Sequence, residues 1–79
     1  MNQDIKDKIR KEIKSIAFAD VLNDASLIKS GVLDSIDIVD LIIFIEENTG
    51  INIPNNDINE ENFDTIDRLM LYLIDRAKN

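Results

Sequence analysis

The sequence predicts a small all-α domain: an up-and-down bundle of three main helices and one short helix, with a long first loop. Apolar residues recur at three- and four-residue spacing in three parts of the chain, which is the period of an amphipathic helix. The chain has 79 residues, enough for one domain spanning residues 1–79. Residues 51–54 alternate like a strand, but no second strand is available to pair with them. We therefore expect an extended connection there and no sheet.

The first predicted helix begins at Asn2 or Gln3. Its apolar face consists of isoleucines spaced by four, four and three residues: Ile5, Ile9, Ile13 and Ile16. The positions between them hold five of the nine basic residues: Lys6, Lys8, Arg10, Lys11 and Lys14. Because the rest of the chain is so acidic, we interpret these bases as a solvated face and not as a contact with nucleic acid or lipid.

Residues 17–33 show no sustained period. A connection of this length is unusual in a compact domain unless it is anchored, so we predict an ordered loop. Apolar side chains are expected to hold it against the helices: Phe18, Val21, Leu22, Leu27, Ile28, Val32 and Leu33. Gly31 gives the backbone freedom just before the second helix.

The second predicted helix is apolar on two faces. Asp34 or Ser35 is expected to cap its start, and Gly50 lies just past its end. The face expected to be buried comprises Ile38, Leu41, Ile42, Ile45 and Thr49. A helix in so small a domain has one core to face, so the opposite stripe, Ile36, Val39 and Ile43, is expected at the surface. Four acids accompany this stripe: Asp37, Asp40, Glu46 and Glu47. An apolar stripe with acids around it is typical of a protein-docking surface, so we call Ile36, Val39 and Ile43 the docking stripe.

A brief helical turn is expected between residues 58 and 63, and the last helix is expected to follow. Asp64 or Thr65 is predicted to cap it, with Asp67 answering in a capping box. Its core face is predicted to be Ile66, Leu69, Met70, Leu73, Ile74 and Ala77. The nearby acids do not form an EF-hand loop, because Asn62 and Arg68 stand where that loop requires Gly and Glu. We expect no metal site.

Composition argues against an enzyme. The chain has no cysteine and no histidine, so a serine nucleophile has no imidazole base to activate it. The net charge is −7, and residues 30–67 contain ten acids and no lysine or arginine. Such a field repels nucleic acid and anionic membranes and attracts basic protein surfaces. No segment approaches the roughly 20 apolar residues of a membrane span. We expect a cytoplasmic monomer.

Several residues together resemble the acyl carrier protein family: Asp34-Ser35-Ile36 at a helix start, acids along that helix, and then Ile51-Asn52-Ile53-Pro54. The resemblance extends from about Ile5 to Leu73. It implies that a separate phosphopantetheinyl transferase attaches 4′-phosphopantetheine from coenzyme A to Ser35, and that Asp34 helps to present this serine. The attached arm would hold acyl or aminoacyl groups as thioesters. Ligases or synthases with basic patches would then dock on Ile36, Val39 and Ile43 and their acids.

The spacing around Ser35 leaves the pathway open. Carriers of fatty acid synthesis typically have Gly-x-Asp-Ser-Leu, whereas Gly31 stands three residues before Asp34 and Ile36 replaces the leucine. This spacing is more similar to D-alanyl carrier proteins and to carriers of polyketide or nonribosomal peptide pathways. The acidic second helix is more similar to the fatty-acid type. The alternative from another class is an acidic helical protein-interaction module without a cofactor.

Overall fold

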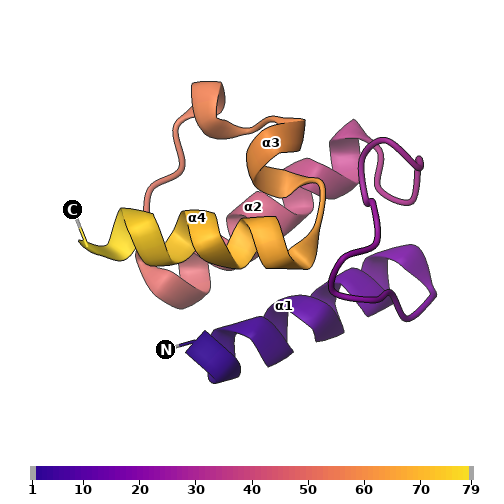
Figure 1. Cartoon of the computed structure of the whole chain (residues 1–79), viewed down its shortest axis with the longest axis horizontal. Coiled ribbons are helices and arrows are strands. Elements are labelled where there is room, and N and C mark those ends of the chain that lie inside the picture. Colours follow the sequence, from indigo (N-terminus) through magenta and orange to yellow (C-terminus); the bar gives the residue numbers. More distant parts are fainter. Residues whose placement is uncertain (1, 79) are drawn as a thin grey trace.

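The computed structural model describes residues 2–78. Its helices are α1 (Asn2–Ala17), α2 (Ser35–Thr49), α3 (Glu60–Phe63) and α4 (Ile66–Lys78), with a single 3₁₀ turn, η1 (Asn55–Asp57), before α3 (Figure 1). The described residues contain no strand, and residues 51–54 form an extended connection as predicted. The predicted all-α fold of three main helices and one short helix is confirmed. Within residues 2–78, no helix is both long and apolar enough to span a membrane.

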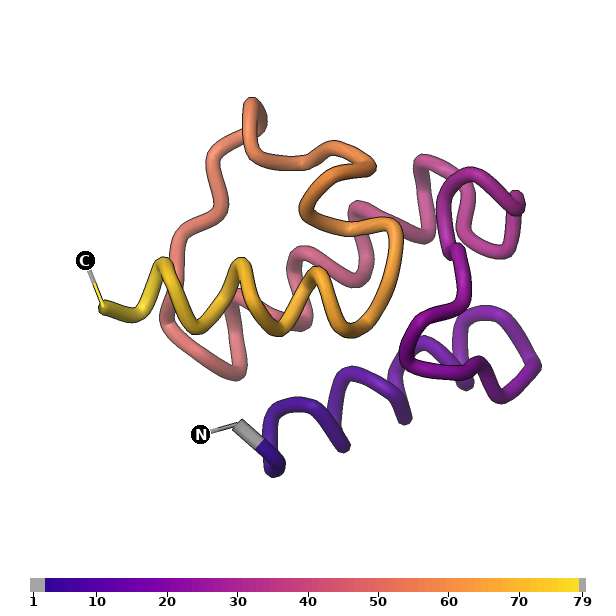
Figure 2. Tube along the Cα trace, in the orientation of Figure 1, coloured from indigo at the N-terminus to yellow at the C-terminus, as the bar shows by residue number. Residues whose placement is uncertain are grey.

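The main helices pack around one core. α1 and α2 run antiparallel, and α4 runs in the same general direction as α2 because residues 50–65 return the chain across the bundle (Figures 1 and 2). α1 contacts both α2 and α4, while α3 packs on α4. The start of α2, the start of α4 and the loop of residues 18–34 lie at one end of the molecule. The first turn of α1 and the last turn of α4 lie at the other.

The predicted helix faces form the core. Its fully buried side chains come from every helix and from the first loop: Ile9, Ile13, Leu27, Leu41, Ile45, Phe63, Ile66, Leu69 and Leu73. Of the residues predicted on these faces, Ile16, Thr49 and Ile74 are half-buried, and Ala77 is exposed because α4 ends beyond the core. The short helix begins at Glu60, where the Asn59 side chain accepts a hydrogen bond from Asn62 N at 3.0 Å.

The first loop is ordered, but only part of its predicted packing is correct. Leu27 and Leu33 are buried, and Val21 and Ile28 pack against the core. Phe18, Leu22 and Val32 are exposed by 94%, 72% and 37%, so the prediction that they hold the loop was wrong. Phe18 directly follows α1 with a φ of 57°, a left-handed conformation that ends the helix. Without a period in the sequence, nothing distinguished the inward from the outward apolar residues.

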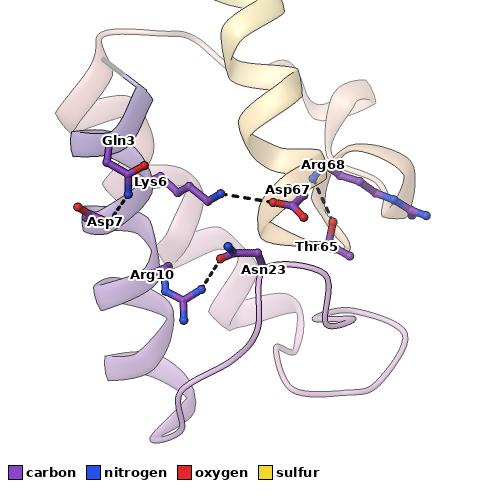
Figure 3. Close-up of polar contacts among 8 residues, drawn as sticks. All are labelled: Gln3, Lys6, Asp7, Arg10, Asn23, Thr65, Asp67 and Arg68. Carbon is purple, nitrogen blue, oxygen red and sulfur yellow. Dashed lines mark hydrogen bonds and ion pairs between the residues drawn. The ribbon is translucent and has the colours of Figure 1, made fainter.

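Polar contacts brace α1 and the loop against α4 (Figure 3). Asn23 accepts a hydrogen bond from the Arg10 guanidinium on its side chain, and one from Asp67 N on its carbonyl at 3.0 Å. Lys6 forms an ion pair with Asp67 at 3.5 Å, and Arg10 forms one with Asp20 at 3.3 Å. The solvated-face interpretation therefore fits the exposed Lys8, Lys11 and Lys14, whereas Lys6 and Arg10 connect elements.

A second contact ties η1 to α4. The Tyr72 hydroxyl donates to Asp57 Oδ2 at 2.6 Å, and its ring lies 5.5 Å from that of Phe63, centroid to centroid. Burial, together with the hydrogen bond and the negative charge of Asp57, raises the pKa of Tyr72 to about 12, with Arg76 opposing the shift. Each of these causes except Arg76 penalises the phenolate.

Ultraviolet titration of Tyr72 tests this contact, because the chain has one tyrosine and no tryptophan. We expect the phenolate to form with a midpoint near 12 in the folded chain and near the ordinary value of 10.0 in urea. Since the folded-state pKa is raised, the contact contributes stability that is complete below pH 10 and lost as the pH rises toward 12. Asp57→Asn should lower the folded midpoint. A midpoint at 10 in the folded wild-type chain would contradict the contact.

Candidate functional site

Ser35 is the first residue of α2 and is exposed. Asp34 is the N-cap: its Oδ1 accepts from Asp37 N at 2.8 Å, and Asp37 Oδ2 accepts from Asp34 N at 3.1 Å. This reciprocal capping box satisfies two amide donors at the helix start and settles the sequence alternatives in favour of Asp34. Among the described residues, the Ser35 hydroxyl has no hydrogen-bond partner. It is therefore accessible at the positive end of the helix dipole.

The docking stripe lies at the surface, as predicted. Ile36, Val39 and Ile43 are exposed by 71%, 56% and 49%, whereas Ile38, Leu41, Ile42 and Ile45 are buried. α2 therefore presents an apolar face to the core and a second one to solvent. An uncovered apolar stripe on one side of a helix is typical of a protein-docking surface.

The four acids predicted to accompany the stripe differ in their surroundings. Asp40 and Glu47 are exposed. Asp37 is half-buried and engaged in the capping box. Glu46 is half-buried, and its Oε2 accepts from Ile53 N at 2.9 Å and holds the connection after α2. The freely exposed acids along this helix are thus Asp40 and Glu47.

An open cleft of about 420 Å³ adjoins Ser35. Three separate segments line it. They are Ile28 and Leu33 of the first loop, the cap and first turns of α2 (Asp34, Ser35, Ile38 and Val39), and the residues that lead into α3 (Ile58, Asn59 and Glu60). Most of the lining comes from isoleucine, leucine and valine side chains, while Asp34, Ser35, Asn59 and Glu60 add polar groups. Sequence analysis did not find this cleft, because no local pattern brings these segments together.

A second hollow of about 470 Å³ lies between α1 and α2, lined by Lys8, Lys11, Glu12, Ser15, Phe44 and Asn48. Although it is slightly larger, it contains none of the residues of the Asp34-Ser35 motif. Its lining is polar except for Phe44, whereas most of the lining of the cleft is apolar. The cleft beside Ser35 is therefore the better candidate site.

Asp64 does not cap α4, contrary to one of the predicted alternatives. Thr65 does so instead, since its Oγ1 accepts from Arg68 N at 3.0 Å (Figure 3), and Asp67 pairs with Lys6 and does not complete a capping box. The Asp64 side chain is buried, and its Oδ1 accepts from Ser26 Oγ at 2.9 Å, Ile28 N at 2.9 Å and Lys29 N at 3.0 Å. One sequence signal indicated that Asp64 is buried: it stands between the apolar residues Phe63 and Ile66.

Opposing effects act on the Asp64 carboxyl. Burial by itself would raise its pKa. Hydrogen bonds from Lys29 N, Ile28 N and the Ser26 hydroxyl, with the charge of Lys29, outweigh burial and lower the pKa below its ordinary value of 3.8. Asp64 is therefore ionised at neutral pH and acts as an acceptor for the loop.

No protein-family model matches the chain. The chain is similar to a D-alanyl carrier protein of Streptococcus suis (strain 98HAH33), with 28% identity over 74 residues. The similarity covers 91% of this chain and 94% of that protein. It confirms the resemblance to the acyl carrier protein family. Because both chains are matched over nearly their full length, the similarity concerns the whole domain.

Removing the cap should weaken α2. We expect Asp34→Ala to lower the free energy of unfolding by about 1 kcal/mol, because the Asp37 amide loses its acceptor. Asp40→Ala is the matched control on the same helix and should change it by less than about 0.5 kcal/mol. Urea unfolding followed by circular dichroism measures both. Equal losses in the two variants would show that the capping box does not stabilise α2.

Proposed function

We propose that this chain is a carrier protein that holds an acyl or aminoacyl group as a thioester on 4′-phosphopantetheine attached to Ser35. The observation that carries the proposal is the Ser35 side chain, exposed at the start of α2 and beside an apolar cleft. The similarity to a carrier protein over nearly the whole chain supports it. When attached, the prosthetic group supplies the terminal thiol that forms the thioester. The relative's name also supports a non-catalytic carrier.

The residues around Ser35 fit an attached phosphodiester. The side-chain oxygen of Ser35 would form the bond to phosphorus, and the helix dipole favours a negative group at this position. Asp34 holds the first turn of α2 by accepting from the Asp37 amide, so Ser35 is presented on a fixed backbone. We also assign Asp34 a part in presenting Ser35 to the transferase.

D-alanine is the cargo that the comparison favours. The relative is named for carrying a D-alanyl group, and the Gly31-to-Asp34 spacing is more similar to that of D-alanyl carriers than to that of fatty-acid carriers. A D-alanyl ligase would then load the thiol. Fatty acid, polyketide and nonribosomal peptide pathways are the alternatives.

The partners would be the phosphopantetheinyl transferase and the enzymes that load and unload the arm. They would cover the docking stripe, while the acids Asp37, Asp40, Glu46 and Glu47 meet their lysine and arginine side chains. Charges at the edge of an interface mainly set the encounter rate and the choice of partner. A carrier that visits several enzymes needs such brief contacts.

Intact-mass spectrometry tests the attachment. After incubation with coenzyme A and a broad-specificity phosphopantetheinyl transferase, the wild-type chain should gain the mass of one phosphopantetheine. Ser35→Ala should gain none, whereas Ser15→Ala, which alters an exposed serine on α1, should react like the wild type. A folded wild-type chain that keeps its original mass would favour the alternative function, an acidic helical interaction module without a cofactor.

Charge reversal on α2 tests the docking surface. We expect Asp40→Lys and Glu47→Lys each to slow modification of Ser35 by about three- to tenfold at low salt, because a basic partner surface is then repelled. The effect should shrink as salt is added. Glu61→Lys makes the same charge change on α3 and should have a smaller effect. Unchanged rates for both α2 variants at low salt would argue against electrostatic docking on this helix.

A further inference from the structure

The loop segment before Ser35 is closed on itself. Leu33 N donates to Leu27 O at 2.9 Å, and Gly31 N donates to Ile28 O at 3.0 Å. At its start, Ser30 N and Ser30 Oγ bond to Ser26 Oγ and Ser26 O at 3.1 and 2.6 Å. Residues 26–33 therefore form one turn unit. Ile28 and Leu33 both belong to this unit and both line the cleft, so they move together as one wall.

Asp64 attaches this unit to the rest of the molecule. Its Oδ1 accepts hydrogen bonds from the hydroxyl of Ser26 and the amides of Ile28 and Lys29, and its carbonyl accepts one from Leu27 N at 2.6 Å. Asp64 itself lies between α3 and α4 and is only 4% exposed. A buried acceptor with three donors at one oxygen fixes the position of the segment that supplies them.

The unit also leads directly into the site. Leu33 immediately precedes the cap residue Asp34, so a displaced unit would change both the wall of the cleft and the approach to Ser35. The modifying transferase must seat against this surface to reach the hydroxyl. An ordered loop spares the complex the entropy of ordering it on binding.

We propose that Asp64 is a positioning residue for the modification of Ser35: it holds residues 26–33 as one wall of the cleft against which the transferase docks. This inference rests on the proposed function. Asp64 does not touch the reacting atoms. It acts through Ile28 and Leu33, and its loss should therefore raise the KM of the transferase for this chain more than it lowers kcat.

Graded variants test the assignment. Asp64→Ala removes the acceptor, and we expect it to lower kcat/KM for phosphopantetheine transfer by about tenfold, mostly through KM. Ser26→Ala removes one of the three donors and should lower kcat/KM by about two- to threefold. Asp64→Asn keeps a neutral acceptor and should lie between the wild type and Asp64→Ala. Ile13→Val, a conservative core change in α1, is the control for a general loss of stability.

Amide hydrogen exchange reports the position of the loop independently of the enzyme. Ile28 and Lys29 should lose protection in Asp64→Ala, while the amides of α1 keep theirs. If Asp64→Ala does not fold, the same comparison is made with Ser26→Ala and Asp64→Asn. Rates and protection equal to the wild type in folded variants would overturn this inference alone. A wild-type chain that takes up no phosphopantetheine would overturn the proposed function instead.

Discussion

One buried carboxylate, that of Asp64, organises the first loop. The first loop must satisfy its amides without a helix or sheet ladder, and a buried amide without a partner costs free energy comparable to a lost hydrogen bond. Asp64 Oδ1 accepts hydrogen bonds from the amides of Ile28 and Lys29, and the Asp64 carbonyl accepts one from Leu27 N. The donors in turn compensate the burial of its charge. Loop and carboxylate are therefore stable only together, and Leu27 and Leu33 can enter the core.

α2 connects this constraint to the proposed docking surface. Its inner face contributes Leu41 and Ile45 to the core, and its outer face leaves Ile36 and Val39 in water. The outer residues do not stabilise the isolated fold, because burial is what makes an apolar side chain stabilising. Burial of these two side chains is favourable, and it takes place only when another protein covers them. The exposed acids on the same helix keep the uncovered stripe soluble and favour basic partners.

Local signals accounted for the helices and for the start of α2. A three- and four-residue period identifies a helix face, so Ile9, Ile13 and Leu73 were correctly expected in the core. The Asp34 cap was among the alternatives because capping depends on neighbours in the chain. Burial in the loop depends on distant contacts, so Phe18 and Leu22 were misjudged. Asp64 and Thr65 were equivalent as caps until the fold brought Ser26 to Asp64. The modification of Ser35 stays a prediction.

The placement of the chain ends has a practical consequence. α1 starts and α4 finishes at the end of the bundle remote from the start of α2 (Figure 1). A fusion partner or an immobilising tag joined before α1 or after α4 would consequently lie away from Ser35 and its cleft. The domain can be coupled to a solid support, or inserted into a larger assembly, while its serine end faces outward.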